Sequence, residues 1–235
     1  QGGRRVEKRG ILTGNHLKLI AAFTMLVDHM GVMLFPQVRL LRIIGRLAYP
    51  IFAFMIAEGC RYTKNKLRYF LMVFGLGAAC QLVYYFSSGD TRLNILLTFS
   101  ASIPLIYALQ AAHGAQTGKK RVLWSIVFCA GFLTAYGLTL LLRIDYGFWG
   151  IMTPVLVVFS RGKGKADSKL PVLMLSAGLL FLTSDFGGVQ YYALLAIPLL
   201  LLYSGARGRA NLKYFFYLFY PVHLAVLQGI TWIVR

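Results

Sequence analysis

Charged residues, acidic residues and cysteines are all scarce in this sequence. Of its 235 residues only 14% are charged and 7 are acidic, whereas about 25% of a typical soluble domain is charged. The three cysteines, Cys60, Cys80 and Cys129, are scattered through apolar stretches, which fits neither a disulfide framework nor a metal site. The sequence has no P-loop, dinucleotide-binding fingerprint, zinc spacing or serine nucleophile elbow. We therefore expect neither a soluble domain nor a metal centre.

Long apolar runs are what the sequence has instead. Hydrophobic residues make up 58% of the chain, and the mean hydropathy is +0.65. The runs are about 18 to 20 residues long, as a helix needs to cross the hydrocarbon core of a bilayer. They are continuous rather than alternating, which disfavours a β-barrel. We predict one all-α integral membrane domain over residues 1–235, a polytopic bundle with about nine spans. The spans are placed at 16–35, 45–61, 69–86, 94–112, 122–141, 147–160, 170–184, 188–204 and 213–233, of which the sixth and seventh are short.

The net charge of +18 is distributed as membrane topology predicts. Most Lys and Arg residues fall in the N-terminal segment and in every second loop between spans, so the positive-inside rule places the N-terminus in the cytoplasm. Residues 1–12 would form a basic cytoplasmic tail. The same clustering between apolar runs argues against nucleic-acid binding. The opposite side collects the unusual polar residues, which suggests a site open to the outside: Arg46, Asp90, Arg92, Asn94, Arg143, Asp145, Asp185 and Gln190.

Four of the ionisable side chains in the first two predicted spans are functional candidates. Lys18, Asp28 and His29 interrupt the first apolar run, and Arg46 opens the second. Charges at membrane depth are costly unless paired or solvated, so they are functional candidates by default. Arg46 suits a carboxylate, and Asp28 is the partner we expect. Histidine is the usual proton-transfer side chain near neutral pH; the alternative for His29 is a structural bond to a neighbouring helix.

Lys18 and His29 lie on nearly the same face of the first predicted helix. Eleven residues at 1.5 Å each put them about 16 Å apart, roughly half the bilayer thickness. A ligand along this face would place an anionic head at Lys18 and a reactive end near His29. The alternative for Lys18 is a side chain that snorkels to the inner headgroups. In the last predicted span, His223 follows Pro221, and we weigh ligand binding, orientation of other groups and a carbonyl bond equally.

Several stretches resemble the TraX family of bacterial membrane proteins, whose namesake acetylates conjugative pilin. They are Leu17 to Ala21, Met25 to Gly31, Arg42 to Phe54, Asp145 to Ile151 and Tyr217 to Leu224. Lys18 and His29, with ten residues between them, are also similar to the Arg/Lys-x10-His motif of a broader group of membrane acyltransferases. The resemblance therefore implies a multi-pass protein of the bacterial plasma membrane that takes an acyl group from acetyl-CoA.

By that resemblance, Lys18 would contact the acetyl-CoA donor and His29 would be the catalytic histidine. We expect Asp28 and Arg46 to orient the site, Arg46 or His223 to stabilise the oxyanion, and His223 to help bind the ligand. The acceptor would be an amine or hydroxyl of a secreted or surface protein, peptide or glycan. Two alternatives remain from the sequence: a transporter or lipid-binding protein with these residues along its pathway, and a small accessory subunit whose ion pairs are structural.

Overall fold

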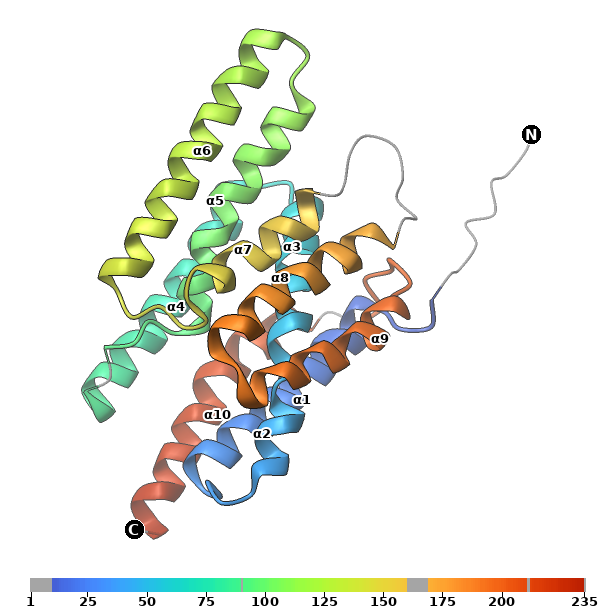
Figure 1. The fold of residues 1–235 in the computed structure, drawn as a ribbon. Coiled ribbons are helices and arrows are strands. Elements are labelled where there is room, and N and C mark those ends of the chain that lie inside the picture. The colour runs from blue at the N-terminus through green and yellow to red at the C-terminus, as the bar shows by residue number, and fades with distance from the viewer. Residues whose placement is uncertain (1–9, 90, 160–168, 211, 235) are drawn as a thin grey trace. The chain divides into compact units, whose positions relative to one another are not determined.

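The structure, a computed structural model of the 235-residue chain, describes residues 10–89, 91–159, 169–210 and 212–234. Helices dominate it (Figure 1). In the described residues the only β-type pairings are two isolated bridges, Leu12 with Tyr203 and Leu93 with Ile144, so the all-α prediction is confirmed. The helices are α1 (Gly14–Met33), α2 (Arg39–Gly45), α3 (Ala48–Tyr62), α4 (Lys66–Ser88), α5 (Ile95–Gly114), α6 (Gly118–Leu141), α7 (Gly147–Phe159), α8 (Leu170–Phe186), the 3₁₀ segment η1 (Gly188–Leu195), α9 (Ala196–Leu201) and α10 (Lys213–Val234).

Five helical stretches in the described residues are long and apolar enough to cross a membrane: Arg39–Tyr62, Lys66–Phe86, Ile95–Gly114, Gly118–Leu141 and Phe215–Ile233. Helix α1 has 20 residues but is not among them, and Lys18, Asp28 and His29 lower its hydropathy. Helices α7 and α8 have 13 and 17 residues. The helical character is thus confirmed and five helices are candidate spans, while nine spans and a cytoplasmic N-terminus stay predictions.

The chain packs as two compact units, divided at Phe52 and again at Val189. In the first unit α1 packs against α2 and against α10. In the second unit α5 packs against α4, α6 and α7, and α7 packs against α8. Helices α5 and α6 form a long antiparallel hairpin (Figure 1). The single domain over residues 1–235 stays a prediction.

Polar residues define where the helices start. Thr13 caps α1 and accepts a hydrogen bond from the His16 backbone N–H. The side chains of Asn65, Asn94 and Thr117 cap α4, α5 and α6 in the same way. Such caps satisfy backbone donors that the first helical turn leaves unpaired. The helix boundaries are therefore encoded locally, by single residues placed before the apolar runs.

The second predicted span is interrupted, and Arg46 does not open it. The span begins at Arg39, α2 ends at Gly45, and Arg46 caps α2 before α3 starts at Ala48. Pro50 supplies the reason, because a proline removes one helical hydrogen bond and its ring clashes with the carbonyl four residues earlier, that of Arg46. The break places Arg46 at a junction between two helices.

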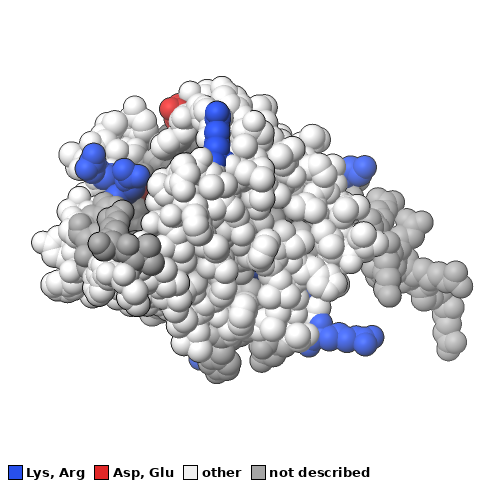
Figure 2. All heavy atoms as spheres, turned by 90° about the horizontal axis from the view of Figure 1, so that it is seen from below, with Lys and Arg blue, Asp and Glu red and all other residues white. Residues whose placement is uncertain are grey.

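The described end of the predicted basic tail contacts another segment of the chain, and the tail itself stays a prediction. Leu12 donates its N–H to the Leu202 carbonyl at 3.0 Å and accepts from the Ser204 N–H at 2.8 Å, so this end is paired to the segment after α9. Other predictions lie outside the described residues, namely those for residues 1–9, Asp90, residues 160–168 and Arg235. On the face drawn in Figure 2, charged side chains are few and well separated.

Candidate functional site

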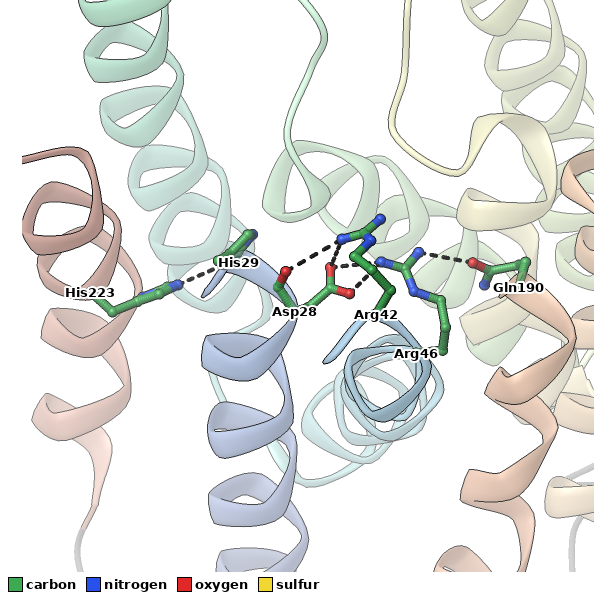
Figure 3. A network of polar contacts seen from close by, with 6 residues as sticks. All are labelled: Asp28, His29, Arg42, Arg46, Gln190 and His223. Carbon is green, nitrogen blue, oxygen red and sulfur yellow. Dashed lines mark hydrogen bonds and ion pairs between the residues drawn. The ribbon is translucent and has the colours of Figure 1, made fainter. Parts of the chain in front are cut away.

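A row of six polar side chains crosses the first unit (Figure 3). His223 comes from α10, Asp28 and His29 from α1, Arg42 from α2, Arg46 from the α2–α3 junction and Gln190 from η1. His223 contacts His29 at one end of the row. On the other side, Asp28 pairs with Arg42 and Arg46, and Arg46 donates to Gln190. Asp28 and His29 are neighbours in the chain. Three of these residues, Asp28, His29 and Arg46, are the catalytic candidates from the sequence, and the fold brings them together.

Asp28 is the centre of the charged part of the row. Its two carboxylate oxygens each lie 2.6 Å from Nη2 of Arg46, and Oδ2 lies 2.7 Å from Nη1 of Arg42. The side chains of Asp28 and Arg46 are 15% and 11% exposed, and that of Arg42 is 32% exposed. One carboxylate thus faces two guanidinium groups, and these three side chains together carry one net positive charge. Such a cluster favours a bound anion or a developing oxyanion.

Glycines let Asp28 reach both arginines. A Cβ atom at Gly45 would overlap the Asp28 side chain, and one at Gly31 would lie 2.9 Å from the Cβ of Leu41. Real Cβ contacts are not that close, so α1 and α2 approach one another only because both positions lack a side chain. The spacing of Arg42 and Arg46, one helical turn apart, then directs both side chains toward Asp28.

Gln190 ends the row and has an unused donor. Its Oε1 accepts a hydrogen bond from Nη1 of Arg46 at 3.0 Å, which fixes the orientation of the amide, because a guanidinium can only donate. The residue is 5% exposed, and its Nε2 is buried without a hydrogen-bond partner among the described residues. Buried donors are nearly always satisfied in folded proteins, so an unsatisfied one calls for an explanation such as a ligand.

The other end of the row is a pair of histidines. Nδ1 of His29 lies 2.8 Å from Nε2 of His223, and Nδ1 of His223 lies 2.6 Å from the carbonyl oxygen of Phe219. The carbonyl can only accept, so Nδ1 of His223 carries a proton. If both rings are neutral, Nε2 of His223 accepts from Nδ1 of His29, and Nε2 of His29 keeps its lone pair. The geometry thus selects the tautomer of His29 that can act as a base at Nε2.

Lys18 lies on the α10-facing side of α1, as His29 does, but it is not part of the row. Its Nζ lies 5.9 Å from the ring centroid of Phe216, seven residues before His223 on α10. The shared face predicted from the eleven-residue spacing is therefore realised, with α10 as the common neighbour. A cation over an aromatic face is weakly stabilised there.

The segment before α10 brings further cations to the Lys18 end of α1. The backbone N–H groups of Gly14 and Asn15 donate to the carbonyls of Ala206 and Arg207 at 2.7 and 3.0 Å. Nδ2 of Asn15 also donates to the Ala210 carbonyl at 2.7 Å. Gly208 has φ +95, and a Cβ there would lie 2.9 Å from Nδ2 of Asn15, so only glycine suits this turn. Arg207 and Arg209 are thereby held at the first turn of α1.

Sequence reasoning foresaw part of this site. It paired Asp28 with Arg46, and Nη2 of Arg46 lies 2.6 Å from both carboxylate oxygens. It gave His223 several roles, and the structure has both a carbonyl bond and a contact with His29. It did not select Arg42, although the four-residue spacing from Arg46 was a usable signal. Gln190 was noted only as an outer polar residue.

Comparison with known proteins places the chain in a family. The family model described as TraX protein matches residues 13–231, a range that includes Lys18 and all six residues of the row. The chain belongs to the TraX family. The resemblance found in the sequence is thus confirmed, and the family together with the five long apolar helices supports a helical membrane protein.

Two curated relatives of this TraX-family chain differ in how much they cover. The chain is 26% identical over 238 residues to a probable fimbrial assembly protein FimC, serogroup H1, of Dichelobacter nodosus, covering 90% of this chain and 92% of the relative. It is 38% identical over 60 residues to the uncharacterized protein RP591 of Rickettsia prowazekii, covering 26% of this chain and 23% of the relative. No solved structure matches the chain.

Proposed function

We propose that this TraX-family protein is an acetyltransferase of the bacterial plasma membrane. It moves an acetyl group from cytoplasmic acetyl-CoA to an amine or hydroxyl acceptor at or across the membrane. The observation that carries the proposal is the histidine pair, which leaves a basic nitrogen on His29 beside a cluster with net positive charge. The fimbrial assembly relative favours a secreted or surface protein as acceptor, with a peptide or glycan as alternatives.

In this proposal His29 is the general base. Nε2 of His29 takes the proton of the acceptor amine or hydroxyl while the acceptor atom attacks the thioester carbonyl carbon. The carbon–sulfur bond then breaks, and the proton passes from His29 to the leaving sulfur, so CoA leaves as a free thiol. His223 acts through His29, because Nε2 of His223 accepts a hydrogen bond from the Nδ1–H of His29. This bond keeps the His29 ring oriented. A base held in this way contributes about 10²- to 10⁴-fold in rate.

The charged cluster would stabilise the oxyanion. Negative charge develops on the carbonyl oxygen of the thioester during the attack, and preorganised donors near that oxygen lower the barrier. Arg46 belongs to a cluster whose positive charge exceeds its negative charge by one, and Gln190 offers a buried donor at Nε2. Asp28 orients Arg42 and Arg46 rather than contacting the substrate. This division of roles makes Asp28 a positioning residue.

The Lys18 end of the first unit fits the phosphates of CoA. Lys18, Arg207 and Arg209 are brought to the same end of α1 by the hydrogen bonds of Gly14 and Asn15. Helix α1 is continuous from Gly14 to Met33, so about 16 Å of helix separates Lys18 from His29. Along this face the phosphates would bind at the cations and the thioester would lie near His29. Lys18, Arg207 and Arg209 would hold the donor.

The test is binding of acetyl-CoA by the purified protein in detergent, followed by thermal shift and by release of free thiol. We expect acetyl-CoA to raise the unfolding temperature of the wild type, and Lys18→Ala to lose most of that shift. Lys169→Ala, an exposed cation at the start of α8, should keep it. His29→Ala should keep the shift but slow thiol release by about 10²- to 10⁴-fold.

Two outcomes would count against the proposal. If millimolar acetyl-CoA gives no thermal shift in the wild type, the acetyltransferase assignment fails, and transport along Asp28, Arg46 and His223 becomes the next hypothesis. If His29→Ala is folded and releases thiol at the wild-type rate, acetyl transfer does not use His29 as base.

A further inference from the structure

A separate cavity lies in the second unit, between α5, α6 and the end of α7. Its volume is about 390 Å³, and its walls include Leu109 and His113 from α5, Arg121, Ser125 and Cys129 from α6, and Phe159 from α7. The α6 residues are spaced four apart and so form one stripe. Beyond this stripe α5 and α6 come into close contact, since a Cβ at Gly131 would lie 2.8 Å from Cδ2 of Leu105.

The walls of the cavity are amphipathic. His113, Arg121 and Ser125 provide donors, while Leu109 and Phe159 provide apolar surface. The rings of His113 and Phe159 lie 6.2 Å apart at a tilt of 59°, so they meet at the border between the two kinds of wall. A ligand that fills this cavity needs a polar group at Arg121 and an apolar part beside it.

The chain segments that form the α5 and α6 walls of the cavity are basic. Lys119, Lys120 and Arg121 form the first turn of α6, and residues 91–144 contain no Asp or Glu. A basic turn of this kind attracts anionic lipid headgroups, each cation near the surface contributing about 1 kcal/mol to binding. The polar group of the ligand is therefore an anion.

Two features of α6 favour a position of the cavity near the level of phospholipid headgroups. Helix α6 is a candidate span on which Ala135 alone among the described residues is buried, so nearly all of it is left to face lipid. Trp124, 39% exposed, lies three residues after Arg121, and tryptophan near lysine and arginine is typical of the membrane–water interface. An anionic ligand with an apolar part at this depth is a phospholipid.

We propose that this cavity binds one anionic phospholipid, with its phosphate at Arg121 and Ser125 and an acyl chain along Leu109 and Phe159. The site lies within the second unit and shares no residue with the row of polar side chains. It is independent of the proposed acetyl transfer. Phosphatidylglycerol has the required chemistry, because it carries a single negative charge on the phosphate, whereas the choline group of phosphatidylcholine adds a cation next to Lys119 and Lys120.

Cys129 makes occupation of the cavity measurable. It is exposed and lines the cavity, whereas Cys60 and Cys80, the other two cysteines of the chain, are buried. The rate at which N-ethylmaleimide, an uncharged thiol reagent, labels the full-length protein in detergent therefore reports access to Cys129. We expect added phosphatidylglycerol to slow labelling about tenfold at ten times its Kd, because labelling follows the unoccupied fraction. Phosphatidylcholine at the same mole fraction should slow it far less.

Two variants identify the site. Arg121→Gln should raise the half-protecting mole fraction of phosphatidylglycerol about fivefold. Arg68→Gln, which removes an exposed arginine from the first turn of α4, should leave that fraction unchanged. In the double variant Cys129→Ala, Ala130→Cys the reporter thiol moves one residue along α6 and turns about 100° away from its former direction. Labelling there should not respond to the headgroup.

Four results would overturn the proposal. Equal protection of Cys129 by both lipids, or protection that survives Arg121→Gln, would rule out a site specific for an anionic headgroup. Protection of the relocated thiol in the double variant would mean general coverage of α6 by lipid. Protection by glycerol phosphate alone, without any lipid, would make the cavity a site for a soluble anion.

Discussion

Replacing Asp28 by Asn tests whether one carboxylate holds the first unit together. The substitution keeps the size of the side chain and removes its charge, so Arg42 and Arg46 face each other without compensation. Removing one partner of a buried ion pair costs about 3–5 kcal/mol, since it leaves a buried charge unpaired. Arg42 is 32% exposed and its share is screened by solvent. We therefore expect a loss of about 3 kcal/mol, at the lower end of this range.

The assay is thermal unfolding of the purified protein in detergent. For a chain of this size, each kcal/mol corresponds to about 2–4 °C, so Asp28→Asn should lower the unfolding temperature by about 6–12 °C. Asp185→Asn removes an exposed carboxylate and should change stability by less than about 0.5 kcal/mol. Adding Arg42→Gln to Asp28→Asn restores the wild-type net charge of the three residues and should recover part of the loss. The reasoning is refuted if Asp28→Asn is no less stable than Asp185→Asn.

Two further substitutions test the close helix contact and the histidine pair. Gly45→Ala should destabilise the protein by about 1–3 kcal/mol, because the added methyl group overlaps the Asp28 side chain. The control is Gly137→Ala, where the Cβ meets nothing within 4 Å, and it should be neutral or stabilising by up to about 1 kcal/mol. Equal effects of the two substitutions on stability would contradict the close contact between α1 and α2. His223→Leu should lower the rate of thiol release about 10²-fold with little change in acetyl-CoA affinity, since His29 loses the acceptor for its Nδ1 proton. His223→Gln can place its Oε1 near the position of the lost Nε2 and should retain more activity, and an equal loss in both variants would refute the orienting role.

The sequence was informative where the signal is local. Eleven residues between Lys18 and His29 put both on one face of α1, and the contacts with Phe216 and His223 show that face turned toward α10. The neighbouring residue Asp28 points toward α2 instead, as the 100° step between adjacent helical residues requires. Helix caps such as Asn94 could likewise be read directly from the sequence, because a cap depends on only a few neighbouring residues.

The sequence was uninformative where partners are distant along the chain. Gln190 meets Arg46 across 144 positions, and no periodicity in η1 indicates which helix it faces. The break between α2 and α3 depends on Pro50 and the carbonyl of Arg46, so the apolar run alone predicts one straight helix. The number of spans is hard to predict for a related reason: the sequence places a span at 16–35, and α1 is a helix of 20 residues there, but Lys18, Asp28 and His29 lower its hydropathy.

Two features of the row go beyond what a structural ion pair needs. Two arginines already satisfy the carboxylate oxygens of Asp28, so the charged part alone would explain a structural role. The histidine pair adds nothing to that neutralisation, because the His29 ring bonds to His223. Nε2 of Gln190 is buried without a partner among the described residues, although folded proteins rarely leave such a donor unsatisfied. A structural network does not need an oriented base on His29 or an open donor on Gln190, so both features support the proposal that the row binds a substrate.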